Sequence, residues 1–166
     1  MIEHAIYNAF HKKEKREKLD RQGNWKYPMF WAIDLHDVII PGTYTRNNDK
    51  REFYQDAKEV LQWLTNRADM CIILYTSSHK DSIADIIKWL SESEIKIDFI
   101  NENPLCPNTE LCDFSGKFYM DILLEDKAGF VGETDWTTIK HTLIDSKQWN
   151  LKKSHTEFNS FSKVVK

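Results

Sequence analysis

The sequence has few of the residues that mark specialised folds. Its 166 residues include five Gly, four Pro and three Cys. The cysteines, Cys71, Cys106 and Cys112, lack CxxC spacing, so the sequence indicates neither a zinc site nor a disulfide framework. Cys71 lies in an apolar run and is typical of a buried free thiol. That pattern favours a reducing, cytoplasmic location.

Long hydrophobic runs and a strong excess of one charge are also missing. The N-terminal segment has a short apolar start followed by a charged run, which is not the pattern of a signal peptide. No stretch approaches the length needed to cross a bilayer, so no membrane partner is expected. The net charge of -3 gives no general electrostatic reason to expect nucleic acid as a partner.

The composition that remains suits one domain with its own core, since 41% of the residues are apolar and 13% aromatic. We expect a charged helical extension at 1–27, an α/β domain at 28–145 and a tail at 146–166. The charged helix is interpreted most simply as a solvated helix with ion pairs along it, and a phosphate-binding arm is the alternative. The tail has four candidate anchors: Trp149, Leu151, Phe158 and Phe161.

Short apolar runs alternate with segments of helical spacing along the chain. The runs predict strands at 29–34, 71–75, 96–100 and 121–124. Helical spacing predicts helices at about 3–21, 54–64 and 83–90 and a last helix that begins near 134. This alternation predicts a three-layer, Rossmann-like α/β fold with a central parallel sheet. If the four strands are numbered along the chain, we expect them to lie in the order 3-2-1-4 across the sheet. We expect no separate cap domain.

Polar residues stand where three of these strands end: Asp34, Thr76, and the pair Glu125 and Asp126. Ligand sites of parallel α/β sheets lie at the carboxyl ends of the strands. An acid that ends a buried strand is costly unless it is paired, hydrogen-bonded or bound to a metal. One such acid could simply cap the next turn. Three at neighbouring strand ends favour Mg²⁺, which prefers a few carboxylates plus water.

Four segments, in order, resemble the motifs of haloacid dehalogenase-like hydrolases over roughly residues 28–145. IDLHDV (33–38) is similar to the first motif, a strand that ends in Asp-x-Asp, and IILYTSS (72–78) to the second. Lys117 matches the basic third motif, and ILLEDKAGF (122–130) resembles the fourth, an apolar strand followed by two acids. The set resembles a capless phosphatase of this superfamily.

The resemblance implies a role for each residue. Asp34 would be the nucleophile that forms an aspartyl-phosphate. Thr76, Ser77 and Lys117 would hold the phosphoryl oxygens of the substrate. From the sequence alone, Thr76 could instead begin a turn, and Lys117 could be a surface lysine. Ser78, with an acid three residues later, resembles a helix capping box.

The magnesium ion would be held by Asp34, Glu125, Asp126 and the backbone carbonyl of His36. His36 stands where the family keeps its second acid, which protonates the leaving group and then activates water. An imidazole can serve as general acid and base, because its pKa is about 6.5. The alternative is a binding protein that has lost its turnover.

The flap at 38–50 carries candidate residues for substrate selection, Arg46 foremost, beside Tyr44, Asn47 and Asn48. A plain turn between two strands explains them equally well. The expected function is a magnesium-dependent phosphomonoesterase for a small or macromolecular substrate, with a nucleic-acid phosphate end as one candidate. The alternatives are a catalytically impaired module that binds metal and phosphate, and an assembly scaffold. Capless members of the family also close their site by oligomerising.

Overall fold

A computed structural model describes residues 2–20, 27–42 and 51–151, and for 18–20 the backbone alone. Four parallel strands form the central sheet in the order β3-β2-β1-β4. The strands are β1 (Met29–Ile33), β2 (Met70–Leu74), β3 (Phe99–Ile100) and β4 (Ile122–Leu124). The α/β class, the parallel sheet and the strand order predicted from the sequence are confirmed.

Strand β3 is shorter than the run that predicted it. The backbone N–H of Lys96 donates to the hydroxyl of Thr65 (3.0 Å), and the carboxylate of Asp98 accepts from the backbone N–H of Ile72 (2.9 Å). At Lys96 and Asp98, side-chain oxygens thus accept the backbone N–H groups that would pair with backbone carbonyls in a longer strand. Strand β3 is therefore only two residues long.

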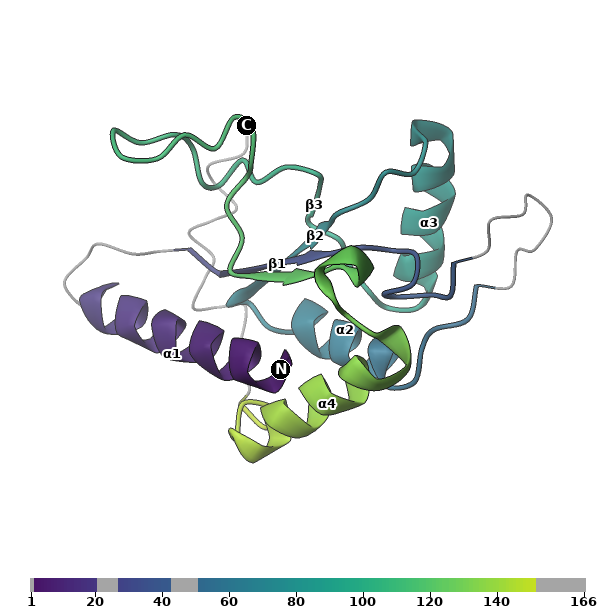
Figure 1. Ribbon diagram of the computed structural model, residues 1–166, viewed down its shortest axis with the longest axis horizontal. Helices are drawn as coiled ribbons and strands as arrows, with labels where there is room; N and C mark the ends of the chain where they lie inside the picture. Colours follow the sequence, from purple (N-terminus) through teal and green to yellow (C-terminus); the bar gives the residue numbers. More distant parts are fainter. Residues whose placement is uncertain (1, 21–26, 43–50, 152–166) are drawn as a thin grey trace.

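Helices α1 (Ile2–Asp20), α2 (Ala57–Thr65) and α4 (Gly132–Asp145) cover one face of the sheet, and α3 (Lys80–Glu92) adds apolar residues to the same cluster. Apolar residues of all four helices join alternate strand residues in one buried cluster, which includes Trp31, Ile33, Ile72 and Leu124. Figure 1 shows α1, α2 and α4 together on one side of the sheet. No helix in the described ranges is both long and apolar enough to span a membrane.

The other face is covered by a segment that contains no helix. Phe30, Cys71 and Ile73 form a smaller buried cluster here, and Leu105, Phe118 and Tyr119 pack against it. Figure 1 shows the chain between β3 and β4 running on the side of the sheet opposite to α1, α2 and α4. This segment, residues 101–121, provides the third layer of the fold.

Helix α1 is fixed to the domain by buried ion pairs as well as by apolar contacts. The ammonium of Lys13 lies 2.9 Å from Asp69, which also receives two bonds from Arg67 (2.7 and 2.6 Å). Arg16 donates to Asp121 (2.6 Å) and to the hydroxyl of Tyr119 (2.7 Å). The interpretation of α1 as a solvated helix is wrong for Lys13 and Arg16, because one face of the helix packs on the domain.

Two further expectations concern the C-terminal part. The anchor Trp149 is confirmed, since its ring stacks on that of Trp63 at 5.7 Å between centroids. Phe158 and Phe161 lie outside the described residues. Helix α4 begins at Gly132, before the predicted start, because the Asp135 carboxylate accepts from the backbone N–H of Val131 (2.9 Å) and closes the first turn.

The Asp69 ion pairs predict a loss of stability in acid. Burial alone would raise the pKa of Asp69, but the bonds from Arg67 and the charge of Lys13 lower it to about 2. A depressed carboxyl pKa stabilises the fold above the unfolded value, and the gain is lost as pH falls through the folded value. Between about pH 5 and pH 2 the free energy of unfolding should therefore fall, with about 2 kcal/mol due to this group.

Urea denaturation at a series of pH values measures this loss. Asp69→Asn should be less stable near pH 7, and its free energy of unfolding should fall less steeply with pH below pH 5. Asp145→Asn, an exposed carboxylate at the end of α4, is the control and should keep the wild-type slope. An Asp69→Asn slope as steep as wild type would contradict the prediction.

Candidate active site

Hydrogen bonds across the ends of three strands bring the candidate residues to one edge of the sheet. The backbone N–H of Tyr75 donates to the carbonyl of Ile33 (2.8 Å), and that of Asp34 donates to the carbonyl of Leu124 (2.9 Å). Strand β1 is thus bonded on both sides up to its last residue. The residues that follow each strand, Asp34, Thr76 and Glu125, must emerge at the same edge.

Three carboxylates meet at this edge. Asp34, Glu125 and Asp126 each offer one carboxylate oxygen, and the three oxygens lie within 4.8 Å of one another. All three residues are half-buried. The predicted convergence of these acids is confirmed, and the oxygens are close enough together to share a metal ion.

The electrostatics of the site are unfavourable for three free anions. Burial raises the pKa of Asp34, and the charges of Glu125 and Asp126 raise it further. A bond from the backbone N–H of Leu35 (2.7 Å) to the Asp34 carboxylate acts in the opposite direction. A divalent cation would remove the mutual repulsion, and carboxylate oxygens are the ligands that Mg²⁺ prefers. The three acids therefore fit a magnesium ion.

A lysine that the sequence analysis did not single out lies beside two of these acids. The ammonium of Lys127 is 3.1 Å from Asp126 and 3.9 Å from Glu125. The bond from Lys127 is the largest of the effects that lower the pKa of Asp126. Lys127 is part of the ILLEDKAGF segment, but nothing in the residues of this segment predicts that the lysine side chain turns back toward the two acids.

His36 is exposed in a tight loop that follows β1. Its charge lowers the pKa of Asp34, so the ring acts on the nucleophile candidate. The loop is closed by the backbone N–H of Asp37, which donates to the carbonyl of Ile40 (2.7 Å). Asp37 has φ 59, a conformation that Gly adopts more easily, and its carboxylate accepts from the N–H of Gly42 (2.7 Å).

Thr76 is held by an asparagine from the neighbouring strand end. The side-chain oxygen of Asn101 accepts from the backbone N–H of Thr76 (2.8 Å), and its amide nitrogen donates to the Thr76 carbonyl (2.7 Å). The sequence analysis missed Asn101. The available signal was an Asn directly after β3, a residue type that tolerates the left-handed conformation observed there, φ 53.

The hydroxyls after β2 do not form the predicted capping box. Helix α3 begins at Lys80, and His79 is its N-cap without a side-chain bond. The Thr76 hydroxyl instead donates to the Ser78 hydroxyl (3.0 Å), while Ser77 is exposed to solvent. This pair orients the Thr76 side chain at the strand end.

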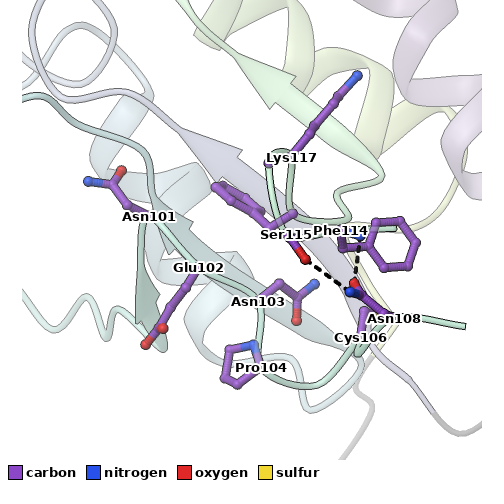
Figure 2. Close-up of a pocket in the computed structure, with 11 residues that line it drawn as sticks. Asn101, Glu102, Asn103, Pro104, Cys106, Asn108, Phe114, Ser115 and Lys117 are labelled. Carbon is purple, nitrogen blue, oxygen red and sulfur yellow. Dashed lines mark hydrogen bonds between the residues drawn. The ribbon is translucent and has the colours of Figure 1, made fainter. Parts of the chain in front are cut away.

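Lys117 is less closely tied to the site. It is exposed in the 101–121 segment and lines a cavity of about 310 Å³ with Asn101 and Glu102. Figure 2 shows its ammonium extending away from these two residues. Within the described ranges, no ion pair joins Lys117 to the three carboxylates. Arg46 and the other flap candidates, Tyr44, Asn47 and Asn48, lie outside the described residues.

Comparisons with known proteins support the fold and nothing finer. No family model matches this chain, and no curated protein matches it. A solved conserved protein coded by a locus from Bacteroides thetaiotaomicron is similar, with a TM-score of 0.55 and 23% sequence identity. The match covers 72% of this chain and 92% of that one. This likeness agrees with the Rossmann-like α/β fold.

The two hydrogen bonds from the Asn101 side chain to the backbone of Thr76 predict a contribution to the free energy of unfolding. Asn101→Gly keeps the left-handed backbone accessible and removes both side-chain bonds, so it should destabilise the fold by about 1–3 kcal/mol. Asn101→Ala should cost more, because Ala adds backbone strain to the lost bonds. Chemical denaturation measures both variants. An Asn101→Gly protein as stable as wild type would mean that these two bonds do not stabilise the fold.

Proposed function

We propose that this protein is a magnesium-dependent phosphomonoesterase of the haloacid dehalogenase-like type. The observation that carries the proposal is the meeting of Asp34, Glu125 and Asp126 within 4.8 Å at the carboxyl edge of a parallel sheet. The same edge carries Thr76, a buried residue with a hydroxyl held by hydrogen bonds. A strand-end carboxylate beside a metal site and a polar anchor is what covalent phosphoryl transfer needs.

The carboxylates of Asp34, Glu125 and Asp126, with the backbone carbonyl of His36, would hold the magnesium ion. When bound, the ion would keep Asp34 ionised and shield it from the negative charge of the incoming phosphate. Burial is the main reason that the pKa of Asp34 is raised, and the charges of Glu125 and Asp126, which such an ion would offset, raise it further.

In the first step a carboxylate oxygen of Asp34 attacks phosphorus, and the bond from phosphorus to the ester oxygen breaks. Protonated His36 gives its proton to the departing alkoxide. In the second step water attacks the phosphorus of the aspartyl-phosphate while neutral His36 takes a proton from it. The bond from phosphorus to Asp34 breaks, which releases phosphate and restores the carboxylate.

Thr76, Ser77 and Lys117 would bind the phosphoryl oxygens during both steps. Thr76 is the best placed of these, because Asn101 fixes its backbone on both sides. Lys117 is on the 101–121 segment, where its long side chain can turn toward an arriving phosphate. Arg46 remains the flap residue proposed to contact the rest of the substrate.

One observation favours a second candidate function, a module that binds metal and phosphate without turnover. His36 stands where the resembled family keeps a carboxylate, and it is exposed to solvent. An exposed imidazole is held less firmly than a packed acid, so proton transfer to a leaving group would be slow. Turnover of a generic phosphomonoester separates the two functions.

The metal site predicts stabilisation by magnesium. An ion that binds only the folded state adds about 2.7 kcal/mol at a concentration 100 times its Kd, which for a chain of this size raises Tm by several degrees. Asp126→Asn should lose most of this rise. Differential scanning fluorimetry with and without MgCl₂ measures it, with Asp145→Asn as the control that keeps the wild-type response. An Asp126→Asn protein that responds to magnesium as wild type does would place the metal elsewhere.

The proton transfer assigned to His36 predicts dependence on the leaving group. An aryl phosphate with a good leaving group needs little protonation, whereas an alkyl phosphate needs much. His36→Ala should therefore slow hydrolysis of the alkyl ester by about 10²–10⁴-fold and that of the aryl ester far less. Steady-state kinetics on p-nitrophenyl phosphate and glycerol phosphate measure the difference.

Two further variants serve as controls for this prediction. Asp34→Asn should abolish turnover of both esters, because no nucleophile remains. His36→Asp should keep turnover, and its pH profile should lie at lower pH because a carboxyl has a lower pKa than an imidazole. If His36→Ala slows both esters equally, His36 has a structural role.

A further inference from the structure

A groove of about 820 Å³ lies beside the candidate site. Its lining includes the apolar or aromatic side chains of Tyr75, Phe118, Met120 and Leu123, together with Lys117. Its size is in the range of small-molecule sites, about 300–1,000 Å³. Large apolar side chains around such a space suit a ligand with an apolar, planar part.

Strand alternation places this groove on the same face of the sheet as the candidate nucleophile. Ile33, Leu74 and Leu124 point into the helix-covered cluster. The next residue of each strand therefore points to the opposite face, which gives Asp34, Tyr75 and Glu125 a common face. Glu125 continues the extended backbone, with φ -152 and ψ 129. Leu123 in the groove shares this face with Glu125.

The groove is open to solvent, and its lining combines apolar and aromatic side chains with the charged residues Lys117, Asp113 and Asp121. Tyr75 is 41% exposed and Leu123 is 40% exposed. The ring of Phe118 meets that of Tyr75 edge-on, with centroids 6.1 Å apart, so the two rings support each other. Exposed aromatic rings bind planar rings by stacking. Lys117, which lines the same groove, supplies a positive charge suited to a phosphate.

The distance between a ring bound in the groove and a phosphate bound at the candidate site distinguishes between kinds of planar ligand. Leu123 pairs with Ala32, two residues before Asp34. Two residues along a strand span about 7 Å, so a ring over Leu123 lies at least about that far from Asp34. An aryl phosphate joins its ring to phosphorus through one oxygen and is too short. A nucleoside monophosphate puts a sugar between ring and phosphate. The net charge of -3 favours one nucleotide over a long polyanionic strand.

We propose that the groove formed by Tyr75, Phe118, Met120 and Leu123 binds the base of a nucleoside monophosphate whose phosphate lies at Asp34. The proposal rests on the proposed phosphatase function and names its substrate class. Tyr75 stacks on the base, Phe118 contacts the edge of the base, and Leu123 packs against the ring.

Binding of non-hydrolysable phosphonate analogues of AMP and of ribose 5-phosphate tests the groove without turnover. Isothermal titration calorimetry with MgCl₂ should give at least tenfold tighter binding for the AMP analogue. Tyr75→Ala should reduce that ratio about tenfold, which is within the usual cost of removing a ring that stacks on a base. Tyr7→Ala is the control, because Tyr7 lies on α1 with a matching exposure of 40%, and should keep the ratio.

A second pair of variants covers the case in which Tyr75→Ala disturbs the adjacent Thr76. Leu123→Thr keeps a residue suited to a strand and should lower the ratio several-fold. Ile144→Thr is its control, because Ile144 on α4 has a similar exposure of 41%. This variant should leave the ratio of the two affinities unchanged. Equal affinity for the two analogues in wild type would overturn the proposal, as would tighter binding of a phosphotyrosine peptide.

The outcomes also separate this proposal from the phosphatase function. If p-nitrophenyl phosphate is hydrolysed but the two analogues bind equally, the groove assignment fails and the phosphatase stands. If the AMP analogue binds tightly through Tyr75 but no phosphomonoester is hydrolysed, the base-binding groove stands and the phosphatase fails. If neither analogue binds, the groove assignment is overturned whatever the turnover.

Discussion

Hydrogen bonding on both sides of β1 is the constraint on which the site depends. All five residues of this strand are buried, and it pairs in parallel with β2 and β4. Because side chains alternate along a strand, a slip of one residue in either pairing would exchange the residues of the large helix-covered cluster with those of the smaller cluster on the opposite face. The core therefore fixes the register. The register in turn places Asp34 beside the pair of acids that follows β4.

Two acids in this protein, the buried Asp69 and the half-buried Asp34, show how the surroundings decide the charge state of a carboxyl. Asp69 meets Arg67 and Lys13, and its pKa falls to about 2. Asp34 is also removed from water but has two acids as neighbours, so its pKa rises. The first arrangement stabilises the fold. The second makes the charged form of Asp34 unfavourable, and such perturbed groups are concentrated at functional sites.

The parts of this fold that follow from local patterns were predictable, and the parts set by distant partners were not. Short apolar runs predicted the strands and the acids at their ends, and helical spacing predicted most of the helices. The bond between Arg16 and Asp121 joins residues 105 positions apart, and no local signal connects them. Asn101 reaches Thr76 only because β3 lies beside β2. The positions of Lys117 and Lys127 depend on irregular backbone, which residue spacing does not determine.

The 101–121 segment is tied to the rest of the protein at a few specific points, and one of them reaches α1. Arg16 of α1 donates to the Tyr119 hydroxyl, and the backbone N–H of Phe30 in β1 donates to the carboxylate of Asp121 (2.9 Å). Burial raises the pKa of Tyr119 to about 12, so its hydroxyl keeps its proton and donates to Asp121 (2.9 Å). Helix α1 thus holds one end of the segment that lines the groove, which gives its buried charges a part in shaping the site.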